Sequence, residues 1–512
     1  MRLSLSAFPV FAGLLALGCS GDGQADADGS TLTVLYQADE RLFGPYWDVE
    51  AQFLLFLPLF SFDENGETVG RLAEAWEHSP DYRVWTIRLR RGVRWHDGVP
   101  VTAQDIEFSL ALYAHPEVLW EDVWWGIDSV AVLDDRTVRL FYEWPADARN
   151  AWAVFYPKHL LEGLDPKGFY GWEFWTHPVG NGPYRYVRHV PKTMVELEAN
   201  PDYFRGTPKV ERVLFKFGGG TGLTELMSGG IDVLTWMNRA EILKVASDPR
   251  FRLYHHMWPG VPWHEAIYWN HRHPLFRDPP VRRALTLAID RRELIRVLNM
   301  PDDLQVADVV YSGRQYRRGE LPEPLPYDPG LAGRLLDGLG WREVGDDGIR
   351  RRNGKRMSFT ALVPSGGVER EAAIYVQAKL RAVGVEMKLQ PLDGNLVRRR
   401  LRSGNYEAAL QRFYSGVPEL KQRLVGEGSP LGWIRPRLSA IVDSVVQEPD
   451  PATEDRVYRA FWPAMGAEVP LTLLFPLVQT YAVHRRVRGL RSPFHGDPIQ
   501  FMEELWVEDD GG

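Results

Sequence analysis

The residues best suited to chemistry in this 512-residue chain are its histidines. His96 stands beside Asp97 within Trp95-His96-Asp97-Gly98, and a neighbouring carboxylate can orient an imidazole as a general base. A hydrolytic triad also needs a nucleophile, which this motif does not supply. The Asp-Gly pair suits a tight turn, and the tryptophan suits packing. We therefore expect the motif to be structural.

A second group of histidines lies further along the chain. Neutral imidazole is a good metal ligand, and five imidazoles fall within 19 residues: His255, His256, His264, His271 and His273. Their spacing matches no standard zinc pattern, and cysteine partners are absent. We expect these side chains to be solvated or hydrogen-bonded. A nickel or metal-chelate ligand remains an alternative.

The sequence contains no complete motif for two other kinds of chemistry, nucleotide binding and hydrolysis. The glycine-rich Gly180-Asn181-Gly182-Pro183-Tyr184 lacks the Gly-Lys-Ser/Thr of a phosphate loop, so we interpret it as a turn. Glycoside hydrolysis needs two carboxylates across a cleft, and no motif pairs any of the abundant acidic residues. An exported hydrolase is therefore the weaker alternative.

The elements that must position these residues are of mixed type. Alternating apolar residues predict half-buried strands at Trp85–Leu89 and Val138–Tyr142, the latter after a turn at Asp134-Asp135. Thr102 and Asp105 have the spacing of a capping box, which predicts that a helix begins there. The pattern favours an α/β fold.

The strongest local prediction is a strand–helix–strand unit in the second half of the chain. Phe359, Ala361 and Val363 alternate as a strand, a helix from about Glu369 to Val383 follows, and Val385 begins another alternating strand. This order and spacing are typical of a βαβ unit with a parallel sheet.

Composition limits the function classes. Roughly 480 mature residues exceed one ordinary core, so two or three lobes are expected. The net charge of −8 argues against a nucleic-acid partner, because phosphate binding needs a basic surface. The chain has 19 tryptophans and one cysteine, so no intramolecular disulfide can form.

The N-terminus has the features of an export signal. Arg2 precedes an apolar stretch from Leu5 to Leu17, which is too short to span a bilayer comfortably. The stretch ends at Gly18-Cys19, which resembles a bacterial lipoprotein signal, so residues 1–18 are expected to be the signal peptide and Cys19 the lipidated residue. Residues 19–30 then form a polar tether between anchor and domain.

Three blocks spread over the chain carry a joint pattern. They are Arg71–Trp76 with Thr86–Gly98 and Pro100–Asp105; Pro178–Tyr184 with Asn200–Phe204 and Gly206–Pro208; and Asp278–Arg291. In order and spacing, the chain resembles the extracytoplasmic solute-binding proteins of the peptide and nickel type (family 5) that serve bacterial ABC importers. The resemblance covers nearly the whole mature chain.

The resemblance implies an α/β fold of two lobes that close like a clamshell, with an extra subdomain on the N-terminal lobe. The first lobe would comprise residues 31–52, 176–271 and 482–512. The inserted subdomain would span residues 53–175, and the second lobe residues 272–481. Ligands favour such lobe interfaces, and closure over the ligand is a hinge motion.

The same resemblance implies where ligand contacts lie. Segments approaching the cleft would bring Trp236, Trp263 and Trp269 toward the solute, unless these rings pack in the core. The stretch that contains Arg412, Tyr414, Ser415 and Glu419 lies where many peptide-binding members carry an Asp-rich segment that pairs with the peptide amino terminus. No Asp occurs here. This departure puts ordinary free peptides in doubt.

The expected function is therefore a non-enzymatic binding lipoprotein. It would capture a peptide or peptide-like solute and deliver it to an ABC permease, whose ATPase supplies the energy. An oligosaccharide or a metal chelate is the alternative ligand, and a sensory or chaperone-like binding role is a further class. We expect no cofactor, no resident metal, no nucleic acid and a monomer, exported and held on the cell membrane through its lipid.

Overall fold

The computed structural model describes most of the chain beyond its first 30 residues. The described residues are 31–36, 49–63, 67–118, 126–150, 153–218, 222–235, 237–257, 263–490 and 498–508. The expected signal peptide, Cys19 and the tether lie outside them. Within the described ranges, no helix combines the length and the apolar character needed to cross a bilayer.

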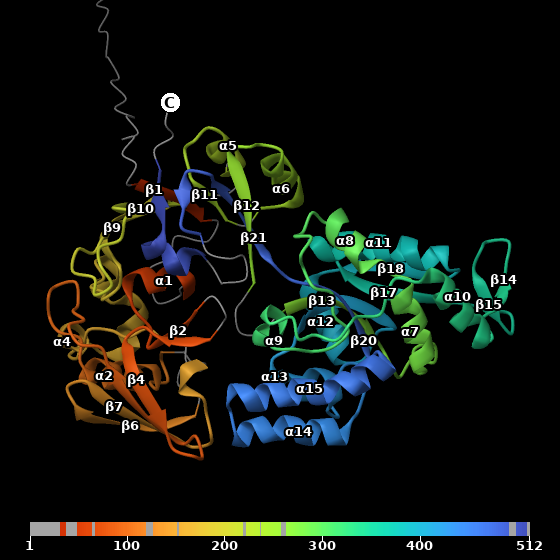
Figure 1. Ribbon diagram of the computed structural model, residues 1–512, viewed down its shortest axis with the longest axis horizontal. Helices are drawn as coiled ribbons and strands as arrows, with labels where there is room; N and C mark the ends of the chain where they lie inside the picture. The colour runs from red at the N-terminus through yellow and green to blue at the C-terminus, as the bar shows by residue number, and fades with distance from the viewer. Residues whose placement is uncertain are drawn as a thin grey trace, which may run out of the picture.

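The first of two large sheets has seven strands (Figure 1). In spatial order they are β12 (Phe251–His256), β21 (Gln479–His484), β11 (Val233–Leu234), β1 (Thr31–Tyr36), β10 (Arg212–Phe217), β9 (Met194–Ala199) and β8 (Tyr184–Val190). Strand β1 runs parallel to β10 and β11, whereas β21 runs antiparallel to β11 and β12. We call the part built on this sheet the first lobe. Its short helices include α5 (Gly222–Met227) and α6 (Arg239–Ala246).

A four-stranded antiparallel sheet extends the first lobe. Its strands, in spatial order, are β4 (Ala73–His78), β5 (Val84–Leu89), β7 (Thr137–Tyr142) and β6 (Ile127–Asp134). A two-stranded sheet of β2 (Phe60–Phe62) and β3 (Thr68–Gly70) belongs to the same part. Its helices are α1 (Val49–Leu55), α2 (Ala103–Tyr113) and α4 (Lys158–Leu161). Both predicted strands and the hairpin between β6 and β7 are confirmed. The predicted helix start is confirmed too, because the Thr102 amide donates to the Asp105 carboxylate at 2.8 Å.

One apolar core joins these two parts. Buried Leu32 and Val34 of β1 belong to the same packed cluster as Trp85 and Ile87 of β5. The four-stranded sheet therefore packs as part of the first lobe, through burial of apolar surface.

The second large sheet has five strands. Their spatial order is β18 (Glu386–Leu392), β17 (Ser358–Pro364), β19 (Ala408–Tyr414), β13 (Trp263–Trp269) and β20 (Leu471–Pro476). Helix α11 (Val368–Ala382) connects β17 to β18, which pair in parallel, so the predicted βαβ unit is confirmed. We call the part built on this sheet the second lobe.

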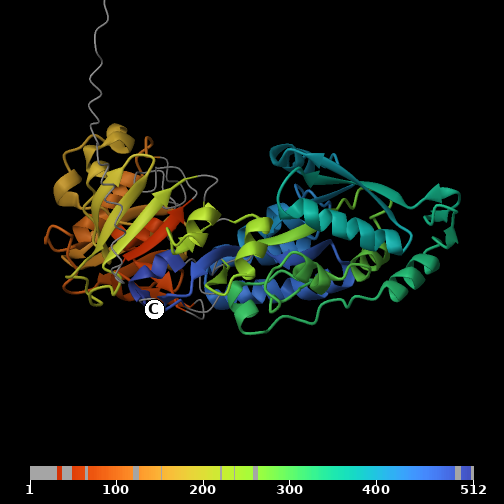
Figure 2. The same cartoon turned by 90° about the horizontal axis from the view of Figure 1, so that it is seen from above.

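Helices surround this second sheet (Figures 1 and 2). They are α7 (Pro279–Leu287), α8 (Arg291–Val297), α9 (Gly313–Arg317), α10 (Pro329–Gly338), α12 (Gly394–Arg402), α13 (Val417–Leu420), α14 (Pro436–Gln447) and α15 (Pro451–Glu468). The remaining described strands form two small sheets. One contains β14 (Glu343–Val344), β15 (Arg350–Arg352) and β16 (Lys355–Arg356). The other contains β22 (Val487–Arg488) and β23 (Trp506–Val507). The second lobe has its own core, separate from that of the first.

Strand pairing corrects two expected borders between the lobes. Residues up to His271 were expected in the first lobe, but β13 pairs with β19 and β20 of the second sheet. Conversely, β21 begins at Gln479, before the expected border at Tyr481, and pairs with β11 and β12 of the first sheet. The chain thus passes from the first lobe to the second between the end of β12 and the start of β13, and it returns between the end of β20 and the start of β21. The partners of β13 are at least 139 residues away in sequence, as for Trp269 and Ala408, so local pattern could not identify them.

Candidate functional site

In each large sheet, parallel strands end along one edge. In the second sheet these ends are Pro364, Leu392 and Tyr414. In the first sheet they are Tyr36, Phe217 and Leu234. Ligands of open α/β sheets bind outside the carboxyl ends of the strands, because the loops that leave this edge converge there.

The two crossovers connect these carboxyl edges to each other. The first crossover leaves β12 at His256 and enters β13 at Trp263, and the second leaves β20 at Pro476 and enters β21 at Gln479. His256 pairs with Gln479 across the first sheet, and His264 pairs with Pro476 across the second. The carboxyl edges therefore meet at the junction of the lobes, where Figure 1 shows β21 between the two bodies.

Two aromatic rings stand at this edge of the second lobe. Trp263 and Tyr414 are paired across β13 and β19, with ring centroids 4.7 Å apart. Trp263 is 39% exposed, which is high for a tryptophan, and burial raises the pKa of Tyr414 to about 12. The Trp263 carbonyl accepts a hydrogen bond from the Leu477 amide at 2.7 Å, which ties the pair to the second crossover. An exposed, fixed ring of this kind can stack on a planar or apolar group.

Next to the rings lies a cluster of two carboxyls and one guanidinium. Arg412 of β19 donates from Nε to Glu369 Oε1 of α11 at 3.0 Å. Glu265 of β13 is directly opposite Arg412 and is fully buried. Burial raises its pKa well above the ordinary value, the negative Glu369 adds to this, and Arg412 offsets it in part.

The loop after β19 continues this surface. Ser415 is buried, and its carbonyl accepts a hydrogen bond from the Tyr458 hydroxyl at 2.8 Å. Gly416 has no room for a side chain, since a Cβ there would lie 2.5 Å from Glu419 Oε2 and 2.7 Å from the Tyr414 ring. Glu419 is half-buried at the start of α13. The loop thus holds Glu419 against the Tyr414 ring.

The two lobes also contact each other near α9. Arg318, just after α9, forms an ion pair with Glu67 beside β3 at 2.7 Å, and both side chains are about half exposed. This contact links the four-stranded part of the first lobe to the second lobe.

Comparison with known families agrees with this geometry. The family model described as bacterial extracellular solute-binding proteins, family 5 middle, matches residues 67–425, well over half of the chain. The chain belongs to this family. Family 5 proteins are the substrate-binding components of ABC importers, which is the role of this chain.

The relatives support the same fold. The oligopeptide-binding protein AppA of Bacillus subtilis is 26% identical over 394 residues, covering 73% of this chain and 69% of that protein. Its structure with a nonapeptide has a TM-score of 0.64 at 21% identity and covers 93% of this chain and 99% of its own. NikA of Brucella suis, solved with Fe(III)-EDTA, has a TM-score of 0.76 at 19% identity and covers 93% and 100%. These neighbours have the two-lobed α/β fold that the resemblance implied.

The predicted family 5 site residues divide into three groups. Trp263, Arg412, Tyr414 and Glu419 gather at the carboxyl edge, with Ser415 buried behind them. Trp236 lies outside the described residues. Trp269 was predicted as a contact, which is wrong.

The error at Trp269 has a clear physical reason. This ring is fully buried at the other end of β13, packed on Phe276 and Phe359, and its indole donates to Thr472 at 3.0 Å. The alternative that this ring packs in the core is the correct one.

The histidines are structural where the structure describes them. His96 is half-buried, and loss of hydration lowers its pKa to about 4. Its ring bonds the Gly180 amide and the Gly182 carbonyl, which joins the two sequence motifs. Side chains at Gly180 and Gly182 would collide with the Leu55 and Leu54 carbonyls, so the glycines are required.

The later histidines are held in a similar way. His264 bonds the Tyr311 hydroxyl at 2.7 Å, His255 bonds Thr480, and His271 bonds the Pro470 carbonyl. Among the described residues, no group of three His, Cys, Asp or Glu could hold a metal ion.

The sequence prediction missed Glu265 and Glu369. A carboxylate within the otherwise apolar strand Trp263–Trp269 was the available signal for Glu265. Glu369 lies 43 residues before Arg412, at the start of a helix, so nothing local indicated their contact.

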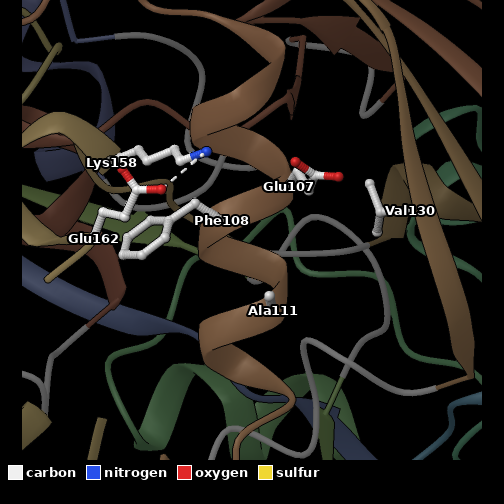
Figure 3. Close-up of a pocket in the computed structure, with 6 residues that line it drawn as sticks. All are labelled: Glu107, Phe108, Ala111, Val130, Lys158 and Glu162. Carbon is white, nitrogen blue, oxygen red and sulfur yellow. Dashed lines mark ion pairs between the residues drawn. The ribbon is translucent and has the colours of Figure 1, made fainter. Parts of the chain in front are cut away.

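A hollow elsewhere is a poorer candidate. About 410 Å³ in volume, it lies against α2 in the four-stranded part of the first lobe (Figure 3). Lys158 and Glu162 line it and pair with each other at 3.5 Å. It is distant from both carboxyl edges, where family 5 geometry brings the loops together.

Proposed function

We propose that the chain captures a peptide or peptide-like solute between its lobes, closes over it and delivers it to a membrane permease. The observation that carries the proposal is the convergence of Trp263, Tyr414, Arg412 and Glu419 at the carboxyl edge beside both crossovers. Exposed rings can pack against side chains, and charged groups can fix the solute ends.

The ligand class is tested by native mass spectrometry of residues 20–512 purified gently from cells. These residues include every described element, so the anchor alone is removed. A ladder of co-purified peptide masses is the expected result. A single mass that fits an oligosaccharide or a metal chelate would contradict the peptide class while leaving the binding role intact.

Closure is tested separately by small-angle scattering. The two crossovers can act as the hinge, since both connect the same pair of edges. We expect the radius of gyration to fall on addition of the identified solute. An unchanged radius at saturation would contradict closure. We also propose a first lobe of residues 31–52, 176–256 and 479–512, an inserted subdomain of residues 53–175 and a second lobe of residues 263–476. Two of these borders are moved from their expected positions because of the strand pairing.

We further propose that the mature protein is a monomeric lipoprotein anchored through Cys19, non-enzymatic, and facing the periplasm or the cell exterior. Its support is the leader that ends in Gly18-Cys19. The variant Cys19→Ser should lose the lipid attachment, shown by the absence of radiolabelled fatty acid in the purified protein. Incorporation equal to that of the wild type would contradict the anchor.

A further inference from the structure

Glu265 is a buried carboxyl group without a hydrogen-bond partner. It is fully buried on β13, and neither of its oxygens has a hydrogen-bond partner among the described residues. Such a group is costly, because it has left water without replacing the lost hydrogen bonds. A group of this kind at the edge that binds the solute calls for a functional explanation.

Its neighbours define the chemistry that it could serve. From α11, Glu369 approaches; from β19, Arg412 stands opposite; from β20, the paired residue is Phe475, which cannot titrate. Trp263 is two residues before Glu265 on the same strand and therefore on the same face. Arg412 thus acts on both carboxyls: it pairs with Glu369 and attracts Glu265 without a hydrogen bond.

That cation is the most easily moved member of the cluster. The Arg412 side chain is 54% exposed, whereas the Glu369 side chain is 9% exposed. An ion pair whose guanidinium already reaches water contributes little, so Arg412 can leave Glu369 at small cost. The carboxylate, by contrast, is fixed at the helix start, where a Cβ at Gly367 would lie 2.5 Å from Glu369 Oε2.

We propose that Glu265 and Glu369 form a subsite for a positively charged group of the solute, occupied by Arg412 until the solute arrives. The inference rests on the proposed function and specifies its ligand class: a solute with an ammonium or similar cation. This carboxylate pair comes from β13 and α11, not from the loop after β19.

Charge balance gives the proposal a second consequence. Burial, with the negative Glu369 adding to it, raises the pKa of Glu265 well above its ordinary value and so favours the neutral carboxyl. When the solute cation replaces Arg412, attraction to the new positive charge favours ionisation of Glu265. Its O–H bond breaks, the proton passes to water, and the carboxylate accepts a hydrogen bond from the solute. Binding therefore releases up to one proton per solute.

The test uses one peptide mixture in two forms. Residues 20–512 are incubated with a tryptic digest of casein, before and after complete acetylation of its amines, and captured peptides that end in lysine are quantified. Wild type should capture the untreated peptides at least about tenfold better. Glu369→Gln should bring this ratio close to one, and Glu265→Gln should lower it severalfold.

Two further variants separate a binding role from a structural one. Glu407→Gln makes the same charge change at the opposite end of β19, where Glu407 accepts the Thr360 amide, and should leave the ratio unchanged. Arg412→Gln should raise capture of the untreated peptides severalfold, since the solute no longer competes. Reduced capture would overturn the displaceable role of Arg412.

Calorimetry of a captured lysine-ended peptide in two buffers of different ionisation enthalpy completes the test. Proton release is expected in wild type and absent in Glu265→Gln. Equal capture of both digests by wild type would overturn the subsite while leaving peptide binding intact. Capture of neither digest would overturn the peptide proposal and the subsite together.

Discussion

The two ends of β13 place the same residue type in opposite roles. Trp263 and Trp269 are six residues apart, so both side chains fall on one face of the strand. Trp263 lies at the carboxyl edge, is 39% exposed and stacks beside Tyr414, whereas Trp269 is fully buried against Phe276. Position along the strand, and not residue type, decides whether a tryptophan ring stays partly exposed at the carboxyl edge or fills the core.

Neighbouring side chains repeat this contrast across the strand. His264 and Glu265 are adjacent and point to opposite faces. Burial lowers the pKa of His264 to about 3 and raises that of Glu265 well above its ordinary value, so it favours the neutral form of both side chains. His264 is satisfied by Tyr311, while Glu265 has no such hydrogen bond in the described structure. The His264 side chain is therefore satisfied within the fold, whereas the Glu265 carboxyl is satisfied by none of the described residues.

The largest expected effect is at the core end. Trp269→Ala should lower the free energy of unfolding by about 3–5 kcal/mol, because it leaves a cavity in the second core. Trp263→Ala should lower it by less than about 1 kcal/mol, since its ring is partly in water already. Urea denaturation of both variants measures the difference. Equal losses of unfolding free energy in the two variants would contradict the difference in burial between Trp263 and Trp269.

The next effect comes from His264 when the pH falls. Its pKa is about 3 in the folded chain and near 6.5 unfolded, so between these values the unfolded state binds more protons. Stability contributed by the neutral imidazole is complete above pH 6.5 and decreases toward pH 3. Between pH 6.5 and 5 the loss should be about 2 kcal/mol for this group, from 1.4 kcal/mol per pH unit.

Unfolding measurements at pH 7 and pH 5 test this, with His264→Gln as the comparison. The variant should lose about 2 kcal/mol less between the two pH values than wild type does. An identical loss in both proteins would show that His264 is not buried neutral, and would remove the contrast with Glu265.

A third effect concerns the exposed end and appears in binding. Trp263→Ala should weaken capture of a bound peptide about tenfold, which corresponds to about 1.4 kcal/mol. The physical reason is loss of a fixed ring beside Tyr414. Titration calorimetry measures it, with Trp341→Phe, a ring of the second core remote from the carboxyl edge, as control. Affinity unchanged by Trp263→Ala would show that the exposed ring does not contact the peptide.

The smallest effect tests whether the exposed end faces the first lobe. Arg318 and Glu67 form an ion pair between lobes, with both side chains about half exposed. Such pairs contribute about 0.2–1 kcal/mol, so the coupling energy in a double-mutant cycle of Arg318→Gln and Glu67→Gln should fall in this range and vanish at 1 M salt. A coupling energy of zero at low salt would show that Arg318 and Glu67 do not interact in solution.

Local pattern predicted the elements better than their partners. The alternation at Trp85–Leu89 and the βαβ unit around α11 were confirmed, because each is fixed by residues close in sequence. The partners of β13 could not be predicted, since β19 and β20 lie far along the chain. The lobe borders, taken from the resemblance, were therefore displaced at both crossovers.

The site was predicted in part for the same reason. Arg412 and Tyr414 were named as candidates because their segment departs from the pattern of the family that the chain resembles. Glu265 and Glu369 were missed, because their meeting depends on the register of β13 against β19 and on the start of α11. A carboxyl in an apolar strand is ambiguous until the sheet shows which face is covered.

The second lobe is one uninterrupted stretch of chain, and this bears on how new binding properties can arise. It enters at Trp263 and leaves at Pro476, and the Leu477 amide bonds the Trp263 carbonyl, so entry and exit are adjacent. Only two joints, side by side, connect it to the rest. Recombination at these two positions could therefore exchange the whole second lobe between related genes. In the same way, a second lobe from a relative could be joined to this first lobe by two fusion points.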